Sequence, residues 1–111
     1  MSNEKYSVSL SLEAKEDLRS IASYISYTLK NKIAAHNQTQ RIRKEIRDLN
    51  LFPKRFGLVE WEPWHSMDIH KMPVDNFVVY YLVQVDSREV IVVRIFYGGR
   101  DVERIVNEDI E

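Results

Sequence analysis

The chain has no cysteine, which excludes a disulfide framework and any metal site built from thiolates. It also lacks an apolar run of the roughly 18 residues that a membrane-spanning helix requires, since the apolar stretch near residues 77–85 is far shorter. Residues 1–5 do not show the cationic and then apolar pattern of a secretory signal. We therefore expect a cytoplasmic protein that does not interact with membranes.

A surplus of basic residues is also missing. The 111 residues include 16 Lys and Arg against 17 Asp and Glu, so the formal net charge is −1. Proteins that bind nucleic acid usually have an excess of basic residues, because neutralising the phosphates supplies much of their affinity. The overall charge therefore argues against a dedicated nucleic-acid-binding protein. We interpret a positive bias over residues 30–47 as a solvated helix face, and the acidic tail from residue 103 as a frayed terminus.

The first half of the chain predicts one strand and two helices. Residues 6–10 alternate between apolar and polar side chains, as in a strand with one buried face. Ser11 is a suitable helix cap, and Asn31 separates two amphipathic helices that end at Pro53. We expect an α-hairpin over about residues 12–51 with one shared apolar seam. Its two stripes are Leu18, Ile21, Ala22, Ile25 and Leu29, then Ala35, Thr39, Ile42, Ile46 and Leu49. Tyr24 and Tyr27 fall beside the first stripe, where we expect them to pack.

The second half predicts three strands, at residues 69–74, 77–85 and 90–97. Asp75-Asn76 has good turn chemistry and a second turn follows at residues 86–89, so the strands form an antiparallel meander. Pro73 is tolerated in an edge strand. The strands are almost continuously apolar, so both faces of the sheet are at least partly covered, one of them by the helical hairpin.

The irregular segment at residues 53–68 contains two tryptophans, Trp61 and Trp64, and each ring has a large area to hide. Two interpretations follow. In one, the segment folds back and covers the core. In the other, it forms a patch that binds a partner.

The last strand ends at a pair of glycines. Gly98 and Gly99 separate Tyr97 from Arg100 and Asp101, and glycine can adopt backbone conformations that are closed to other residues. A strand end of this kind can hold polar groups on a rigid scaffold and point them at a ligand. The alternative is a simple turn in which Arg100 and Asp101 pair with each other.

The order of these elements, together with four motifs, resembles the RelE/ParE toxin superfamily. The motifs are Ala14-Lys15-Glu16-Asp17-Leu18, Leu51-Phe52-Pro53, Met72-Pro73-Val74-Asp75-Asn76-Phe77-Val78-Val79-Tyr80-Tyr81 and Arg94-Ile95-Phe96-Tyr97-Gly98-Gly99-Arg100-Asp101. The resemblance covers about residues 5–106. It implies a single domain over residues 1–111 of the α+β class, with both helices packed on one face of the sheet.

The resemblance also implies the toxin of a bacterial type II toxin–antitoxin module. Its partner is a small cognate antitoxin of the ParD or RelB kind, bound in a hetero-oligomer, and no cofactor is needed. ParE-like members poison DNA gyrase, whereas RelE-like members cleave mRNA in the ribosomal A site. The shared fold does not choose between them. We favour gyrase inhibition, which is not a reaction of the toxin itself, over the mRNA interferase and over an inactive binding module.

A ribonuclease needs a base, an acid and cations that stabilise the phosphate. The candidates are Lys71 with His70 beside it, Arg94, Tyr97 and Arg100. Arg94 and Tyr97 point to opposite faces of their strand, which weakens this interpretation. A structural alternative for Arg94 is a salt bridge with a helix carboxylate such as Asp17.

Other surfaces are predicted from the resemblance. A gyrase poison uses the surface around Arg100, Asp101 and Arg104. The antitoxin binds along the helical seam at Ile21, Ile25, Ile42 and Ile46, bordered by Trp61 and Trp64. No metal site is expected, because His65, Asp68 and His70 have no regular element or further ligand to complete a coordination shell.

Overall fold

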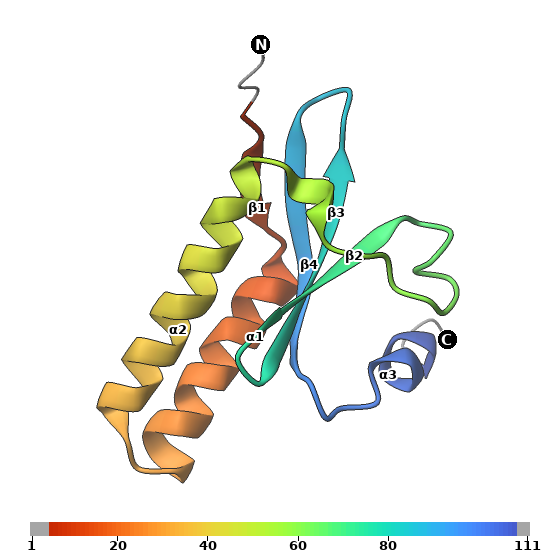
Figure 1. Cartoon of the computed structure of the whole chain (residues 1–111). Helices are drawn as coiled ribbons and strands as arrows, with labels where there is room; N and C mark the ends of the chain where they lie inside the picture. Colours follow the sequence, from red (N-terminus) through yellow and green to blue (C-terminus); the bar gives the residue numbers. More distant parts are fainter. Residues whose placement is uncertain (1–4, 109–111) are drawn as a thin grey trace.

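A four-stranded sheet forms the centre of the computed structural model, which describes residues 5–108. A helical hairpin covers one face of the sheet, and a short C-terminal helix lies on the other side (Figure 1). In chain order the elements are β1 (Ser7–Leu10), α1 (Leu12–Ser23), the π-helical turn η1 (Tyr24–Thr28), α2 (Lys32–Arg47), the 3₁₀ turns η2 (Asp48–Asn50) and η3 (Pro53–Arg55), β2 (Ile69–Val74), β3 (Phe77–Gln84), β4 (Glu89–Tyr97) and α3 (Val102–Glu108). The predicted α+β class, hairpin and meander are confirmed.

The strands lie in the order β1-β4-β3-β2. Strands β2, β3 and β4 pair antiparallel, while β1 pairs with β4 in parallel, so the sheet is mixed. Pro73 lies in the edge strand β2, as predicted. The register between β3 and β4 shifts at Tyr80 and Tyr81, which leaves Val93 as the extra residue of a bulge.

The main core lies between the hairpin and the sheet. Leu18 of α1 and Ile42 of α2 are buried there against Val79 and Tyr81 of β3. The Tyr81 hydroxyl donates a hydrogen bond of 2.6 Å to the carbonyl of Pro53, and burial raises the pKa of Tyr81 to about 12. The predicted seam therefore forms this core.

Part of the first stripe was predicted wrongly. Leu29 is exposed, and so are Tyr24 and Tyr27, which we expected to pack at the edge of the stripe. The cause is the π-helical turn η1, in which the Leu29 N–H bonds the Tyr24 carbonyl at 3.1 Å, five residues back. This wider turn breaks the 3.6-residue period on which the prediction relied.

A second cluster of buried side chains covers the opposite face of the sheet. Trp61 stacks on Trp64, and Trp64 contacts Tyr80, with 5.0 Å between ring centres in each pair. Phe96 of β4 and Val102 of α3 complete this cluster. The segment at residues 53–68 thus folds back over the sheet, as the first of its two interpretations predicted.

The helix α3 was not predicted, because we interpreted the acidic tail as a frayed terminus. Asp101 begins this helix, since its carboxylate accepts a hydrogen bond of 3.3 Å from the Arg104 N–H. Val102, Ile105 and Val106 then pack against the second cluster. Their spacing of three and four residues was the signal that the charged residues obscured.

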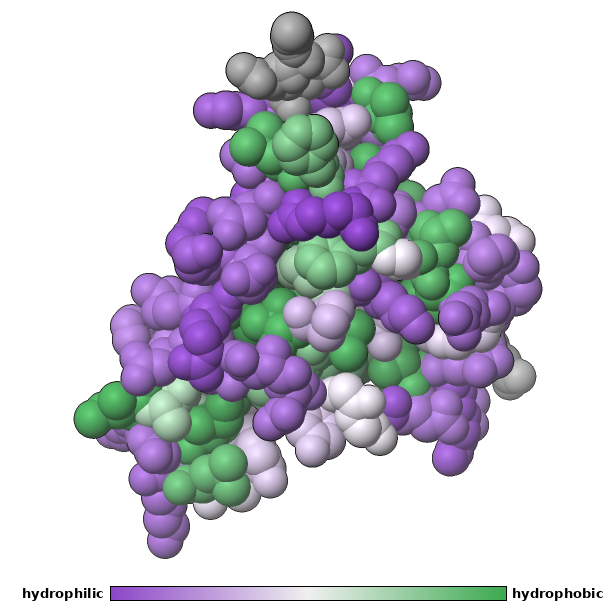
Figure 2. Space-filling model, in the orientation of Figure 1, coloured by the Kyte–Doolittle hydropathy of each residue, from purple (hydrophilic) through white to green (hydrophobic). Residues whose placement is uncertain are grey.

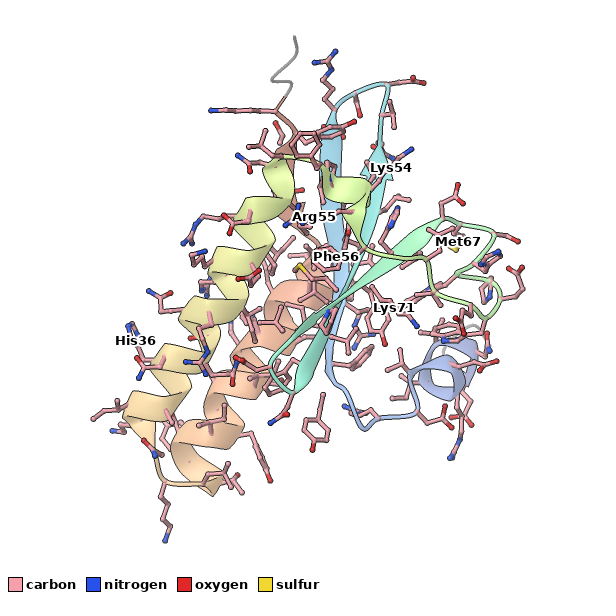
Figure 3. The ribbon with its side chains drawn as sticks, viewed as in Figure 1. His36, Lys54, Arg55, Phe56, Met67 and Lys71 are labelled. Carbon is pink, nitrogen blue, oxygen red and sulfur yellow. The ribbon has the colours of Figure 1, made fainter. Side chains whose placement is uncertain are left out.

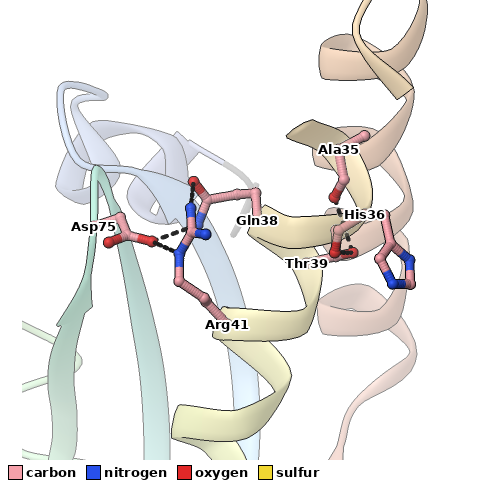
Figure 4. Close-up of polar contacts among 6 residues, drawn as sticks. All are labelled: Ala35, His36, Gln38, Thr39, Arg41 and Asp75. Carbon is pink, nitrogen blue, oxygen red and sulfur yellow. Dashed lines mark hydrogen bonds and ion pairs between the residues drawn. The ribbon is translucent and has the colours of Figure 1, made fainter. Parts of the chain in front are cut away.

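Polar contacts tie the hairpin to the turn between β2 and β3 (Figure 4). Gln38 and Arg41 of α2 donate to one carboxylate oxygen of Asp75, at 2.9 Å and 2.7 Å. These hydrogen bonds, first that of Arg41, hold the pKa of Asp75 below its usual range. Nearby, the Thr39 hydroxyl bonds back to the Ala35 carbonyl at 3.0 Å, so this polar member of the second stripe is satisfied locally.

Candidate functional site

A groove of about 720 Å³ lies at the open edge of β4. Because β1 ends at Leu10, opposite Val92, the rest of β4 has no neighbouring strand on that side. Helix α1 runs along this edge instead and forms one wall. The other lining residues come from η1, β3, the end of β4, the turn that follows it and α3, and they include Tyr24, Phe77, Tyr97, Arg100 and Ile105.

Asp17 of α1 points toward the open edge of β4. Its carboxylate accepts two hydrogen bonds from the Arg94 guanidinium, at 2.8 Å and 3.0 Å, and a third from the Ile95 N–H at 2.9 Å. The Asp17 side chain is 14% exposed and that of Arg94 is 25% exposed. Asp17 therefore pairs a partly buried cation and satisfies a strand-edge donor at once. The structure thus has the salt bridge with Asp17 that we gave as the structural alternative for Arg94.

The ring of Phe96 lies between two arginines. The Arg94 guanidinium sits 4.4 Å from the ring centre, and that of Arg100 sits 5.3 Å from it. Both distances fit a cation–π contact. Arg94 is also held by Asp17, whereas Arg100 is exposed at the rim of the groove.

Tyr97 lies on the other face of β4, as predicted. Arg94 is opposite Tyr80 in the register, and Tyr97 is opposite Phe77. The Tyr97 ring meets Phe77 edge-on with 5.9 Å between centres and is 53% exposed. The groove bends around the open edge of β4, so Arg94 and Tyr97 both line it although they point to opposite faces.

The role predicted for the glycine pair is wrong in its mechanism. Neither Gly98 nor Gly99 has a positive φ, so neither uses the conformational freedom of glycine. Their small size matters instead. A Cβ on Gly98 would lie 3.2 Å from the carbonyl oxygen of Asn76, and one on Gly99 would lie 2.9 Å from the ring of Tyr97.

Lys71 and His70 do not join the groove. Lys71 is exposed on β2 opposite Tyr80, two strands from Arg94 and so roughly 10 Å away, with the buried Tyr80 between them. His70 is buried, stacks on Tyr81 at 5.1 Å, and its Nδ1 lies 2.8 Å from the carbonyl oxygen of Phe56. Its contacts are those of a core residue.

The other two histidines are also remote from the groove. His65 bonds the Val59 carbonyl at 2.8 Å. His36 projects from α2 on the side away from the sheet (Figure 3). Within residues 5–108, no three potential ligands gather closely enough to hold a metal ion.

The residues predicted for target binding surround the start of α3. Arg100 and Arg104 are exposed, and Arg104 pairs with Glu108 at 3.0 Å. Asp101 bonds the backbone of α3 and does not pair with Arg100 as the simple-turn alternative required. Arg100 therefore presents positive charge at the rim of the groove, whereas the charge of Arg104 is paired with Glu108.

The residues predicted for antitoxin binding fall into two groups. Ile42, Ile46 and Trp64 are buried in the two clusters and have no surface to offer a partner, so we exclude them. The stripe of Ile42 and Ile46 faces the sheet. Ile21, Ile25 and Trp61 are half-exposed, and Ile21 lines the groove. Tyr24 and Ile105, which we did not predict, lie there with it.

These features together define a small α+β protein of the RelE/ParE type: a helical hairpin on one face of a mixed sheet, and a groove where the last strand meets a C-terminal helix. The sequence model of a protein family, described as the ParE toxin of the type II toxin–antitoxin system parDE, matches residues 8–102 of this chain. The chain therefore belongs to the ParE toxin family of type II toxin–antitoxin systems.

Solved structures agree with this fold. A chain of the chromosomal ParDE system of P. aeruginosa superposes with a TM-score of 0.70 at 17% identity, covering 86% of this chain and 98% of that one. The RelBE2 toxin–antitoxin complex of Mycobacterium tuberculosis gives 0.64 at 14% identity, covering 86% and 94%. The RelE–RelB complex of Pyrococcus horikoshii gives 0.59 at 16% identity, covering 86% and 98%. No curated protein matches the sequence. None of the described helices is both long and apolar enough to span a membrane.

Proposed function

We propose that this ParE-family toxin inhibits DNA gyrase and that a cognate antitoxin neutralises it. The single observation that carries the choice of target is the engagement of Arg94 by Asp17. A ribonuclease site on this strand needs Arg94 to stabilise a phosphate. Here the guanidinium is paired through two hydrogen bonds, and an anionic substrate has to compete with a carboxylate already in place.

The surroundings of Arg94 support the same choice. The sheet face that it shares with Lys71 is filled by the second cluster, so that Tyr80 is buried and burial raises its pKa. His70 is held between Tyr81 and the carbonyl of Phe56. Among the described residues we find no acid–base pair positioned on that face for proton transfer at a ribose.

The exposed arginines beside the groove provide the proposed target surface. Arg100 and Arg104 lie at the start of α3 and are open to solvent. Exposed charges at the rim of an interface speed association and select the partner more than they add to affinity. We therefore expect these two residues to determine how efficiently the toxin finds its target.

The antitoxin site is proposed to be the groove at the β4 edge. The toxin chains in the RelBE2 and RelE–RelB complexes have this fold. In the present chain, Ile21, Tyr24 and Ile105 give the groove an apolar lining, and Arg100 lies at its rim. We expect nanomolar affinity, about −12 kcal/mol, which requires the antitoxin to cover further surface beyond the groove. Co-expression with the neighbouring small open reading frame tests this, and failure to co-purify contradicts it.

The proposed target is tested by assaying the purified protein in parallel for gyrase supercoiling and for cell-free translation. We expect inhibited supercoiling and intact mRNA. The double variant Arg100→Ala/Arg104→Ala should require an at least tenfold higher concentration to inhibit supercoiling to the same extent. Arg43→Ala is the matched control, because Arg43 is exposed on α2 and lines a separate depression with Val8 and Leu10. Truncated mRNA together with normal supercoiling contradicts the proposal and favours an mRNA interferase.

A further inference from the structure

The free end of the hairpin exposes apolar side chains that the fold does not use. Tyr24, Tyr27, Leu29 and Ile33 are 56%, 70%, 56% and 75% exposed. They lie where α1 turns into α2, at the end of the hairpin in Figure 1, and green atoms gather there in Figure 2. We call these four residues, with Lys30 and Lys32, the tip surface. Its apolar part is on the order of 400 Å², a size at which a patch on a monomer is often functional.

The π-helical turn η1 creates this exposure. None of its five residues is buried. In an unbroken α-helix, Leu29 falls on the stripe of Leu18 and Ile25 and faces the core. The wider turn moves Leu29 outward instead. Turns of this kind are rare and frequently occur at functional sites.

The segment around the tip surface contains basic residues and no acidic ones. Between Asp17 and Glu45 the chain has no acidic residue. The same segment contains six cations. In the described part of the chain, Arg19, Arg41 and Lys44 pair with Glu16, Asp75 and Asp48, which leaves Lys30, Lys32 and Arg43 to give the segment its free positive charge. Because the whole chain carries −1, this segment is a cationic region of a slightly acidic protein. Lys30 and Lys32 pair with no carboxylate among residues 5–108.

We propose that the tip surface binds an acidic segment of a partner polypeptide. Apolar side chains of that segment cover Tyr27, Leu29 and Ile33, and its carboxylates pair with Lys30 and Lys32. Tyr24 also lines the groove at the β4 edge, so one segment can extend from the groove onto the tip. This inference does not depend on whether gyrase or mRNA is the target.

Two other occupants fit less well. A second copy of the chain brings Lys30 and Lys32 against their own copies, and two tips together bury only about 800 Å², the scale of a crystal contact. A nucleic acid satisfies the lysines and can stack on tyrosines. However, it leaves Leu29 and Ile33, two of the exposed aliphatic side chains, without an apolar partner.

The experiment titrates the ¹⁵N-labelled full chain with a synthetic 16-residue amphipathic peptide of leucine and glutamate, followed by amide chemical shifts. We expect the largest shifts at residues 24–36. The double variant Lys30→Glu/Lys32→Glu should bind the peptide at least tenfold more weakly, as should Tyr27→Ser/Ile33→Ser. The matched control Lys15→Glu/Lys54→Glu reverses two exposed charges outside this segment, on α1 and η3, and should change the affinity less than twofold. Circular dichroism verifies that each variant is folded.

Three results overturn the proposal. The first is no binding, or binding with the largest shifts outside residues 24–36. The second is equal binding of a peptide in which lysine replaces every glutamate, since charge then plays no part. The third is that a DNA duplex shifts the same amides at a lower concentration than the acidic peptide does. That result assigns the tip surface to nucleic acid.

Discussion

The contact between Asp17 and Arg94 gives the most demanding test of how this fold is held together. Replacing Asp17 with alanine removes two hydrogen bonds to the guanidinium and one from the Ile95 N–H. Arg94 is then left partly buried without this carboxylate. The open edge of β4 also loses the group that satisfies its backbone donor.

The expected loss follows from these contacts. Breaking a buried ion pair by removing one partner costs about 3–5 kcal/mol, and an unsatisfied buried donor adds about 1–3 kcal/mol. Arg94 retains 25% exposure, so water recovers part of its solvation. We therefore expect Asp17→Ala to lower the free energy of unfolding by about 3 kcal/mol, a large share of the roughly 5–15 kcal/mol typical of a domain.

Urea denaturation of four proteins measures this loss: the parent chain, Asp17→Ala, Arg94→Ala and the double variant. Arg94→Ala should cost less than Asp17→Ala, because Asp17 still accepts from the Ile95 N–H. The double variant should cost little more than Asp17→Ala alone. Glu16→Ala is the control and should change stability by less than about 0.5 kcal/mol, since its pair with Arg19 is exposed and 3.8 Å long. A loss below about 1 kcal/mol for Asp17→Ala, or simple additivity in the double variant, refutes the reasoning.

Two further predictions concern Tyr81 and the glycine pair. Because burial raises the folded-state pKa of Tyr81 from 10.0 to about 12, the neutral hydroxyl stabilises the fold fully below pH 10, and this contribution disappears as the pH rises through about 12. Urea melts from pH 9 to 12 should show an extra loss of about 2 kcal/mol in the parent chain that is absent from Tyr81→Phe. An equal fall in the free energy of unfolding with pH in both proteins contradicts the assignment. Gly98→Ala should destabilise the fold more than Gly99→Ala in thermal melts, because the new methyl group meets the Asn76 backbone in the first case and the movable, exposed ring of Tyr97 in the second. The reverse order excludes close packing as the reason for Gly98.

The sequence predicted those parts of the fold that local patterns determine. The spacing of Leu18, Ile42 and Ile46 identified the core faces of both helices, because burial against a sheet imposes a period of 3.6 residues. Alternation and turn chemistry around Asp75 identified the meander. The charge of Arg94 in an apolar strand led to a carboxylate partner on the first helix as one of its two possible roles, and the structure has that partner.

The parts that were missed depend on contacts between distant segments. The sequence left the loop with Trp64 between two interpretations, and the choice depends on the loop, β4 and α3 meeting around Tyr80. Nothing local distinguishes the π-helical turn at Tyr24 from a continued α-helix, so Leu29 was placed on the wrong side. The groove was missed as a whole, although Arg100 and Tyr97 were named, because its walls come from opposite ends of the chain.

The parallel pairing of β1 with β4 has a consequence for how the toxin is made. Ser11 directly follows β1, and its hydroxyl bonds the carbonyl of Val93, 82 residues later. At synthesis rates of roughly 5–20 residues per second, β1 therefore emerges from the ribosome roughly 4–16 s before its partner strand exists. During that interval the core-facing side of the hairpin has no sheet to cover it, and a chain that stops before β4 lacks the groove and the start of α3. We therefore expect a prematurely terminated copy to be harmless to its host and a substrate for proteases.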